Sequence, residues 1–262
     1  MTTQAYTESV PRTMLIAVCI ALFCSAMVSG AVYFLRPLQA AYASLERNET
    51  ILRAAGRFPS DTGDRAIVNA YLELDARVLD LTSGLPTNTL DGHVYDHWAS
   101  TGVDPGPTLA EMDSVGLNAL PHYVPVYLVP GPAGAERLVL PVHGRGMWSM
   151  LMGYLVLEPD LQTIAALAFY KHGETPGIGD RILDETWLQS WQGKRLYDVS
   201  GEVQIRMNAD TDTPVQYRVD AITGATVTSQ AVGRMVRFWA AAYKPLLHQI
   251  GPEMVRQAGD AP

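Results

Sequence analysis

A single uncharged segment near the N-terminus limits what this chain can fold into. Residues 13–35 contain no Asp, Glu, Lys or Arg, and they lie between Arg12 and Arg36. As a helix this segment would extend for about 34 Å, slightly more than the roughly 30 Å hydrocarbon core of a bilayer. A cleaved signal peptide has a shorter apolar core and a small-residue cleavage site. We predict an uncleaved transmembrane helix over 13–35 after a tail of residues 1–12, and the small residues in 25–31 leave cleavage as the alternative.

Charge and cysteine content argue against several classes of protein. The net charge of −8 disfavours nucleic-acid binding, which requires a basic face. The two cysteines, Cys19 and Cys24, both lie within the apolar segment, so the rest of the chain has no thiol for a disulfide, a zinc site or an iron–sulfur cluster. His93 and His97 are four residues apart, but their surroundings are rich in loop residues and no third ligand is evident. We therefore predict no metal site.

The remaining residues predict one α+β domain over 58–262, with an antiparallel sheet and packed helices. A stalk helix over 36–57 joins it to the membrane segment. A second helix is expected over 65–81, ending at the stop signals Gly84 and Pro86. Apolar runs bounded by turn residues indicate strands and a further helix. The strands are expected at 123–129, 138–142, 150–157, 163–170, 202–207 and 215–219, with a turn at 130–134 and a helix at 182–192.

Residues 220–229 read Asp-Ala-Ile-Thr-Gly-Ala-Thr-Val-Thr-Ser and precede an amphipathic helix. Four hydroxyl side chains surround the Gly-Ala pair: Thr223, Thr226, Thr228 and Ser229. The helix has an apolar stripe with the spacing of one buried face, formed by Val232, Met235, Val236, Trp239, Ala240 and Tyr243. A helix N-terminus offers unpaired N–H groups that favour an anion. The stretch therefore fits either an ordinary cap near Thr226 or Thr228 or a phosphate site. A shorter helix is expected from Pro245 onward.

Two Gly-rich loops in the middle of the chain give a second signal. Residues 140–149 read Leu-Pro-Val-His-Gly-Arg-Gly-Met-Trp-Ser, and residues 171–179 read Lys-His-Gly-Glu-Thr-Pro-Gly-Ile-Gly. The strands expected between them form a hairpin, so both loops should lie at the same end of the sheet. Glycine there permits positive φ and a close approach of the backbone. The alternative is two tight turns, with Trp148 as a core residue.

These motifs carry a resemblance to known families. Thr223-Gly224-Ala225-Thr226 resembles the [Ser/Thr]-Gly-Ala-Thr flavinylation motif of the FMN-binding domain family, in which the last Thr carries FMN through a phosphoester. The two Gly-rich loops, with residues 154–160 between them, are similar to the C subunits of Na+-translocating NADH:quinone reductases. The resemblance implies covalent FMN on Thr226. It also implies further cofactor contacts: Trp148 packing on the flavin ring, Glu174, Thr175, Gly177 and Ile178 as loop contacts, and Thr223, Gly224 and Ala225 at the phosphate end.

The same resemblance implies an enzyme subunit that relays electrons in a Na+-translocating NADH:ubiquinone reductase. Its partners would be the other subunits, a flavin-transferring enzyme and membrane lipid. It implies a single-pass protein of the bacterial inner membrane with its large domain on the periplasmic side. The count of basic residues opposes this orientation, because Arg12 precedes the segment while Arg36, Arg47 and Arg53 follow it. Two alternatives stay open: the flavoprotein subunit of the ferredoxin-linked complex, and a membrane-anchored binding or assembly module without flavin.

Overall fold

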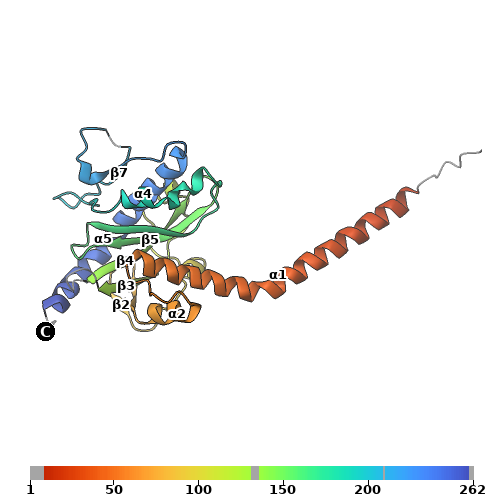
Figure 1. Ribbon diagram of the computed structural model, residues 1–262, viewed down its shortest axis with the longest axis horizontal. Helices are drawn as coiled ribbons and strands as arrows, with labels where there is room; N and C mark the ends of the chain where they lie inside the picture. Colours follow the sequence, from red (N-terminus) through yellow and green to blue (C-terminus); the bar gives the residue numbers. More distant parts are fainter. Residues whose placement is uncertain (1–8, 131–135, 209, 260–262) are drawn as a thin grey trace, which may run out of the picture. The chain divides into compact units, whose positions relative to one another are not determined.

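The computed structural model describes residues 9–130, 136–208 and 210–259, with the backbone alone for 252–259. Two compact units are present, Met1–Leu45 and Glu46–Pro262. The first contains most of the long helix α1, and the second contains the sheet and the remaining helices (Figure 1).

Helix α1 spans Val10–Ala54 without interruption and has Pro37 inside it. The helix therefore continues past the apolar segment as far as Ala54. The helix ends in a Schellman arrangement around Gly56, whose φ is +70°. The N–H of Arg57 donates to the carbonyl of Leu52 at 2.8 Å, and that of Gly56 donates to the carbonyl of Arg53 at 3.0 Å.

The N-terminal part of α1 is long and apolar enough to cross a membrane. Its most apolar stretch of 18 residues has a mean hydropathy of 2.5, and none of that stretch is buried. Side chains such as Phe23 and Val28 are exposed within the unit that holds them. An apolar environment would remove this surface from water, which is the condition that favours such a segment.

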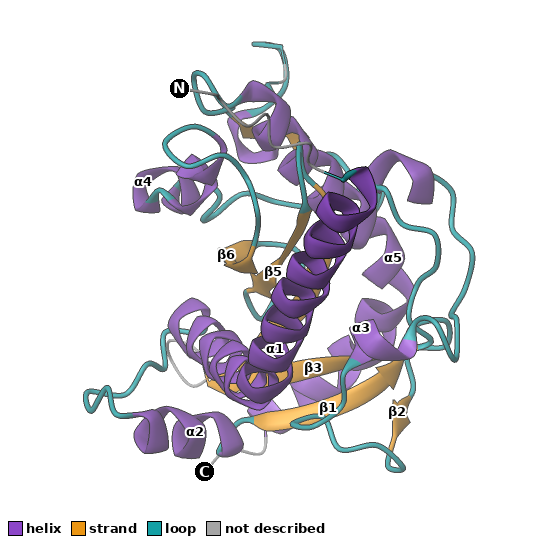
Figure 2. Cartoon of the chain, turned by 90° about the vertical axis from the view of Figure 1, so that its right-hand side faces the viewer, coloured by secondary structure: helices purple, strands orange, loops and turns teal. Residues whose placement is uncertain are grey.

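Six antiparallel strands form the central sheet in the order β2-β1-β3-β4-β5-β6. Figure 2 shows β1 lying between β2 and β3. The four long strands predicted from the sequence are confirmed, whereas the turn at 130–134 falls mostly outside the described residues. The strands span β1 Asp75–Asp80, β2 Pro86–Thr87, β3 Tyr123–Pro130, β4 Glu136–Arg145, β5 Met150–Leu157 and β6 Ile164–Lys171.

Helix α5, Thr226–Gly259, packs its predicted apolar stripe on the sheet. Trp239 and Tyr243 are fully buried and also anchor the helix to β4. The indole N–H of Trp239 donates to the carbonyl of His143 at 2.6 Å, and the Tyr243 hydroxyl donates to that of Pro141 at 2.5 Å. These bonds satisfy polar atoms in the core and fix the helix along β4. The helix continues through Pro245, so the separate C-terminal helix expected there is wrong.

The helix predicted over 65–81 is also wrong in its second half. Helix α2 spans only Asp64–Leu72, and the chain then enters β1. Every residue of β1 pairs with β3, from Asp75 opposite Leu128 to Asp80 opposite Tyr123, and Val78 and Leu79 become buried. Sheet pairing with a strand more than forty residues away thus outweighs the local helical pattern.

One further expected helix and two expected strands are shorter or interrupted in the structure. The helix expected at 182–192 is a 3-10 turn, Gly179–Leu183, followed by α4, Glu185–Gln189. The Asp184 carboxylate separates the two, because it accepts from the N–H groups of Thr186 and Trp187 at the start of α4. The strands expected at 202–207 and 215–219 shrink to a parallel pair, β7 Arg206–Met207 and β8 Arg218–Val219, with a 3-10 turn at Val215–Tyr217.

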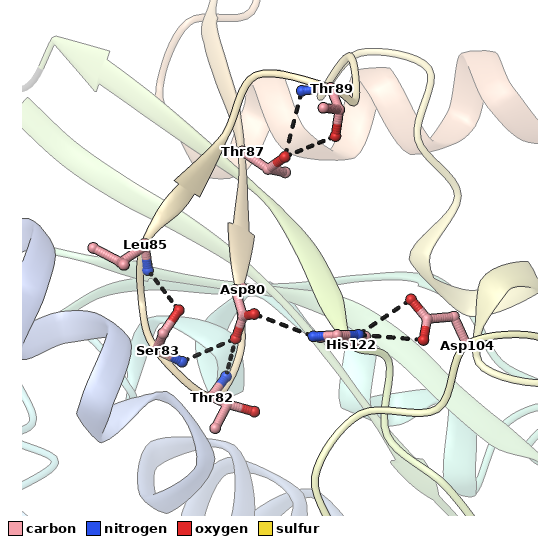
Figure 3. Close-up of polar contacts among 8 residues, drawn as sticks. All are labelled: Asp80, Thr82, Ser83, Leu85, Thr87, Thr89, Asp104 and His122. Carbon is pink, nitrogen blue, oxygen red and sulfur yellow. Dashed lines mark hydrogen bonds and ion pairs between the residues drawn. The ribbon is translucent and has the colours of Figure 1, made fainter.

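The segment before β3, which contains α3 His97–Ser100 and the 3-10 turn Met112–Val115, is fastened by His122. Figure 3 shows the imidazole between two carboxylates: Nε2 lies 3.1 Å from Asp80, and Nδ1 lies 3.2 Å from Asp104. Asp80 also accepts from the N–H groups of Thr82 and Ser83. His122 therefore joins Asp80, at the end of β1, to Asp104, in a loop eighteen residues before the histidine.

Candidate functional site

Three segments meet at the carboxylate of Glu174. They are the loop 146–149 between β4 and β5, the loop 172–179 after β6, and the first turn of α5. Glu174 Oε1 accepts from the N–H groups of Trp148 at 3.1 Å and Ser149 at 3.3 Å. Oε2 accepts from Met147 N–H at 3.2 Å and from the Thr228 hydroxyl at 2.7 Å. The expectation that the two Gly-rich loops lie at one end of the sheet is confirmed, and the start of α5 joins them.

Glu174 is 4% exposed, and its environment favours the ionised form. Burial alone would raise the pKa of this carboxyl group. The hydrogen bonds from Thr228 and from the N–H groups of Trp148, Ser149 and Met147 outweigh that effect and hold the pKa below its usual value. The carboxylate is thus a fixed acceptor that ties the two loops to the helix. A second bond between the loops runs from Gly173 N–H to Ser149 Oγ at 2.6 Å.

Glycines leave the space that Glu174 occupies. A Cβ at Gly146 would lie 2.5 Å from Glu174 Oε1, and a Cβ at Gly179 would lie 2.8 Å from Glu174 Cβ. Any side chain at either position would therefore displace the carboxylate. Gly177 differs, because it has open space around it and a φ of +75°, as expected for a turn that needs a left-handed residue. Gly146 and Gly179 therefore make room for the Glu174 side chain, and Gly177 permits the turn between them.

The four hydroxyl groups at and just before the start of α5 are of two kinds. Thr228 and Ser229 are buried and already paired: Thr228 donates to Glu174, while Ser229 Oγ donates to Ala225 O at 2.9 Å and accepts from Ile222 N–H at 3.0 Å. Thr223 and Thr226 are exposed. The sequence motif therefore contains two structural hydroxyls and two that are available to a ligand.

Thr226 is the first residue of α5, as the sequence led us to expect within one or two positions. Gly224 precedes it with a φ of +85° and open space at its Cβ position. Among the described residues, the N–H groups of Thr226, Val227 and Thr228 have no acceptor. Free N–H groups in the first turn and the dipole of a long helix together make a favourable seat for an anion.

Large apolar side chains surround this end of the sheet. Trp148 is 65% exposed and Ile178 is 54% exposed, although the backbones on both sides of them are pinned by hydrogen bonds. Met147 and Val227 are exposed as well. The alternative in which Trp148 is a core residue is therefore wrong. An exposed indole on a rigid loop is suited to pack against a planar aromatic ligand.

The predicted site residues thus lie on three joined segments. Thr175 and Gly177 are exposed, and the Thr175 carbonyl closes the loop by accepting from Ile178, Gly179 and Asp180 N–H groups. Sequence reasoning missed the role of Thr228, which is the direct link to Glu174, and that of Arg181, whose Nη1 donates to Thr223 O at 2.8 Å. The spacing offered one clue, because Thr228 lies about 200° around the helix from Thr226 and must face the core if Thr226 faces solvent.

Comparison with known proteins identifies the family. Residues 146–241 match the model of the FMN-binding domain, a stretch that starts at the first Gly-rich loop and ends within α5. A protein of Pseudomonas aeruginosa, named as the C subunit of Na(+)-translocating NADH-quinone reductase, is 35% identical over 90% of this chain and 93% of its own length. The chain belongs to this C-subunit family. The C subunit of the Pasteurella multocida reductase is 31% identical over 88% of this chain and 90% of its own length.

Solved structures agree with the C-subunit fold. The crystal structure of NqrC from Shewanella oneidensis has a TM-score of 0.71 at 26% identity and covers 81% of this chain and 99% of that one. The C subunit of the Parabacteroides distasonis reductase, 24% identical with a TM-score of 0.63, shares the fold. These relatives are named for the Na+-translocating complex, which favours the C-subunit assignment over the ferredoxin-linked one. All nine predicted site residues lie inside the matched FMN-binding stretch.

Proposed function

We propose that this chain carries FMN covalently on Thr226, through a phosphoester, and relays electrons within a Na+-translocating NADH:ubiquinone reductase. The observation that carries the proposal is which hydroxyl groups in the first turn of α5 are exposed and which are already hydrogen-bonded. Thr226 presents an exposed hydroxyl beside free N–H groups, while the neighbouring Thr228 and Ser229 hydroxyls are engaged in the protein interior. The FMN-binding match over residues 146–241 supplies the ligand class.

The attachment step is a redox-neutral displacement at phosphorus. A bond forms between Oγ1 of Thr226 and the phosphorus of the flavin nucleotide, and the bond from that phosphorus to the donor's leaving group breaks. The leaving group departs with the electron pair, and the hydroxyl proton is released. A flavin dinucleotide is a suitable class of donor, because its phosphoanhydride provides a stable leaving group, and the flavin-transferring enzyme would supply the catalytic groups. The N–H groups at the start of α5 would then hold the phosphate oxygens.

The other site residues would hold the two ends of the cofactor. Thr223, Gly224 and Ala225 shape the phosphate end, because Gly224 leaves open space beside Thr226. Trp148 packs on the ring, with Thr175, Gly177 and Ile178 as contacts from the second loop. Glu174 acts mainly as a positioning residue, since its carboxylate is engaged by four protein donors. Bound FMN supplies the electron-carrying chemistry, so the protein needs no general acid/base pair or nucleophile for it.

A covalent link also fits the proposed location. We propose that residues 13–35 of α1 anchor the chain in a bacterial inner membrane, with a tail at 1–12 and a stalk at 36–57. The FMN-binding domain, 58–262, would lie on the periplasmic side, in contact with other subunits and lipid. A noncovalent flavin could be lost from that compartment, whereas a phosphoester retains it. The apolar helix and the family membership support the anchor.

A matched pair of variants tests the proposal. Thr226→Val and Thr223→Val each remove one exposed hydroxyl group from the same motif, Thr223–Thr226. After expression together with the flavin-transferring enzyme, we expect denatured Thr226→Val to have lost covalent flavin fluorescence and Thr223→Val to retain it. The alternative, a membrane-anchored binding or assembly module without flavin, predicts that the unsubstituted chain has no covalent flavin fluorescence. It also predicts that Thr226→Val leaves complex assembly and quinone reduction unchanged.

A further inference from the structure

A groove beside the N-terminal half of α5 concentrates positive charge. It has a volume of about 490 Å³, and three of its six lining residues are arginines although the whole chain has a net charge of −8. We call it the arginine groove. It is lined by Arg206 and Met207 of β7 and by Gln230, Gly233, Arg234 and Arg237 of α5.

The three arginines lack acidic partners. In the part of the chain that the structure describes, none of them has a carboxylate oxygen within 4.0 Å. Backbone carbonyls instead anchor two of them: Arg234 Nε donates to Ser114 O at 3.3 Å, and Arg237 Nη1 donates to Ile205 O at 3.0 Å. Because a guanidinium has five N–H donors, these anchors fix the groups and leave most donors free.

Within the described ranges, the three guanidinium groups of the groove lack a neutralising negative charge. Arg237 is half-buried, and a cation that is partly removed from water without an opposite charge is unfavourable. Arg206 and Arg234 add like charge to the same groove. The planar fork of arginine pairs with carboxylates through two parallel hydrogen bonds. The groove is therefore complementary to a cluster of carboxylates.

The groove lies on the helix face that carries Thr226. Residues 226, 230, 233 and 237 follow at intervals of four, three and four, which places them on one face of α5. At a rise of 1.5 Å per residue, Arg237 lies about 16 Å along the axis from Thr226. A protein that approaches the exposed hydroxyl along this face would also cover the arginine groove.

We propose that the arginine groove docks an acidic segment of the flavin-transferring enzyme, rich in Asp or Glu. This inference rests on the proposed flavinylation of Thr226. The three guanidinium groups steer the enzyme toward α5 and set its register, so that its active site reaches the first turn of the helix. They take no part in the chemistry at phosphorus.

The test measures flavinylation of the full-length chain by the purified flavin-transferring enzyme, with a flavin dinucleotide as donor. In the triple variant Arg206→Gln, Arg234→Gln, Arg237→Gln we expect kcat/KM at low salt to fall about tenfold or more, through a raised KM with kcat retained. The triple lysine variant keeps the charge and should retain most of the rate. Arg65→Gln, at an exposed arginine on α2, is the matched control and should behave as the unsubstituted chain.

Salt dependence gives a second readout that a structural defect would not produce. Added salt should slow the unsubstituted chain and leave the glutamine variant nearly unchanged, because salt screens the attraction between the arginines and the acidic segment, which the glutamine variant lacks. Arg206→Glu, an exposed position on β7, repeats the test without altering α5 and should slow the reaction more than Arg206→Gln.

Several results would overturn the inference. Equal kcat/KM and equal salt dependence in the unsubstituted and glutamine chains would remove the docking role and leave the proposed flavinylation intact. Equal losses in the lysine and glutamine variants would indicate a role in shape rather than charge. Normal flavinylation with failed assembly of the complex would assign the groove to another protein of that complex. Failure to modify the unsubstituted chain would instead contradict the proposed function itself.

Discussion

The hydroxyl of Thr228 donates to Oε2 of Glu174 across 2.7 Å, and this bond joins the first turn of α5 to the two Gly-rich loops of the sheet. It connects residues fifty-four positions apart, and both side chains are buried. Thr226, two residues earlier, is exposed on the opposite side of the same turn. The bond therefore fixes where the exposed hydroxyl lies relative to Trp148 and Ile178.

Glu174→Gln should destabilise the domain while preserving its shape. The amide has one acceptor oxygen in place of two, and its NH2 group would face backbone N–H donors that now meet a carboxylate. We expect a loss of about 1–3 kcal/mol in the free energy of unfolding, measured by urea denaturation. Glu73→Gln, at an exposed acid just after α2, is the control and should change stability by less than about 0.5 kcal/mol. Equal stability of the two variants would contradict the role assigned to Glu174.

Thr228→Val and Thr228→Ser separate the hydroxyl from the volume of the side chain. Valine removes the donor to Glu174 and should cost about 1–3 kcal/mol, whereas serine keeps the donor and should cost less. Because Thr228 and Glu174 share one bond, the double variant Thr228→Val, Glu174→Gln should lose clearly less than the sum of the single losses. Additive losses would mean that the two residues stabilise the domain independently.

Trp148→Ala should leave the fold unchanged and alter the flavin. The indole is 65% exposed, so its removal should change the unfolding free energy by less than about 0.5 kcal/mol. An indole packed on the flavin ring quenches its emission, and flavinylated Trp148→Ala should fluoresce more strongly than the unsubstituted protein. Trp148→Phe retains an aromatic face and should be intermediate. Unchanged fluorescence in the alanine variant would place the ring elsewhere.

His122 should make stability depend on pH near neutrality. Its hydrogen bonds to Asp104 and Asp80, together with the charges of both carboxylates, raise the pKa of the imidazole above 6.5. The stabilisation is fully present below the unfolded-state pKa of about 6.5 and is lost as the pH rises through the higher folded-state pKa. Relative to His122→Gln, the unsubstituted chain should lose up to about 1 kcal/mol between pH 6 and pH 8, a small value because the pairs are partly exposed. A difference that grows with pH would contradict this sign.

The sequence predicted the features that depend on local order. The apolar stripe of α5 from Val232 to Tyr243 has one period and one buried face, and the strands at 150–157 and 163–170 are continuous apolar runs between turn residues. Both signals are contained in a few consecutive residues, so no distant contact is needed to read them.

The wrong second half of the helix expected over 65–81 involves a distant partner, whereas the break in the helix expected at 182–192 is a local cap at Asp184. Residues 75–80 look helical by themselves and become a strand because β3 pairs with them. Glu174 stays a proposed loop contact, and its loop sequence alone does not show that its carboxylate accepts hydrogen bonds from residues 147–149 and 228. The short range of helical and strand patterns contains no information about such pairings. The expected hairpin brought the two Gly-rich loops together in advance, and only the motif resemblance joined the start of α5 to them.

The most direct test of the central claim is the mass of the intact full-length chain after expression with the flavin-transferring enzyme, followed by peptide mapping of residues 223–229. The account predicts a gain equal to FMN less one water, located on Thr226 and absent from Thr223 and Thr228. An unmodified peptide under those conditions, or a flavin on another hydroxyl, would contradict the assignment of Thr226 as the covalent carrier.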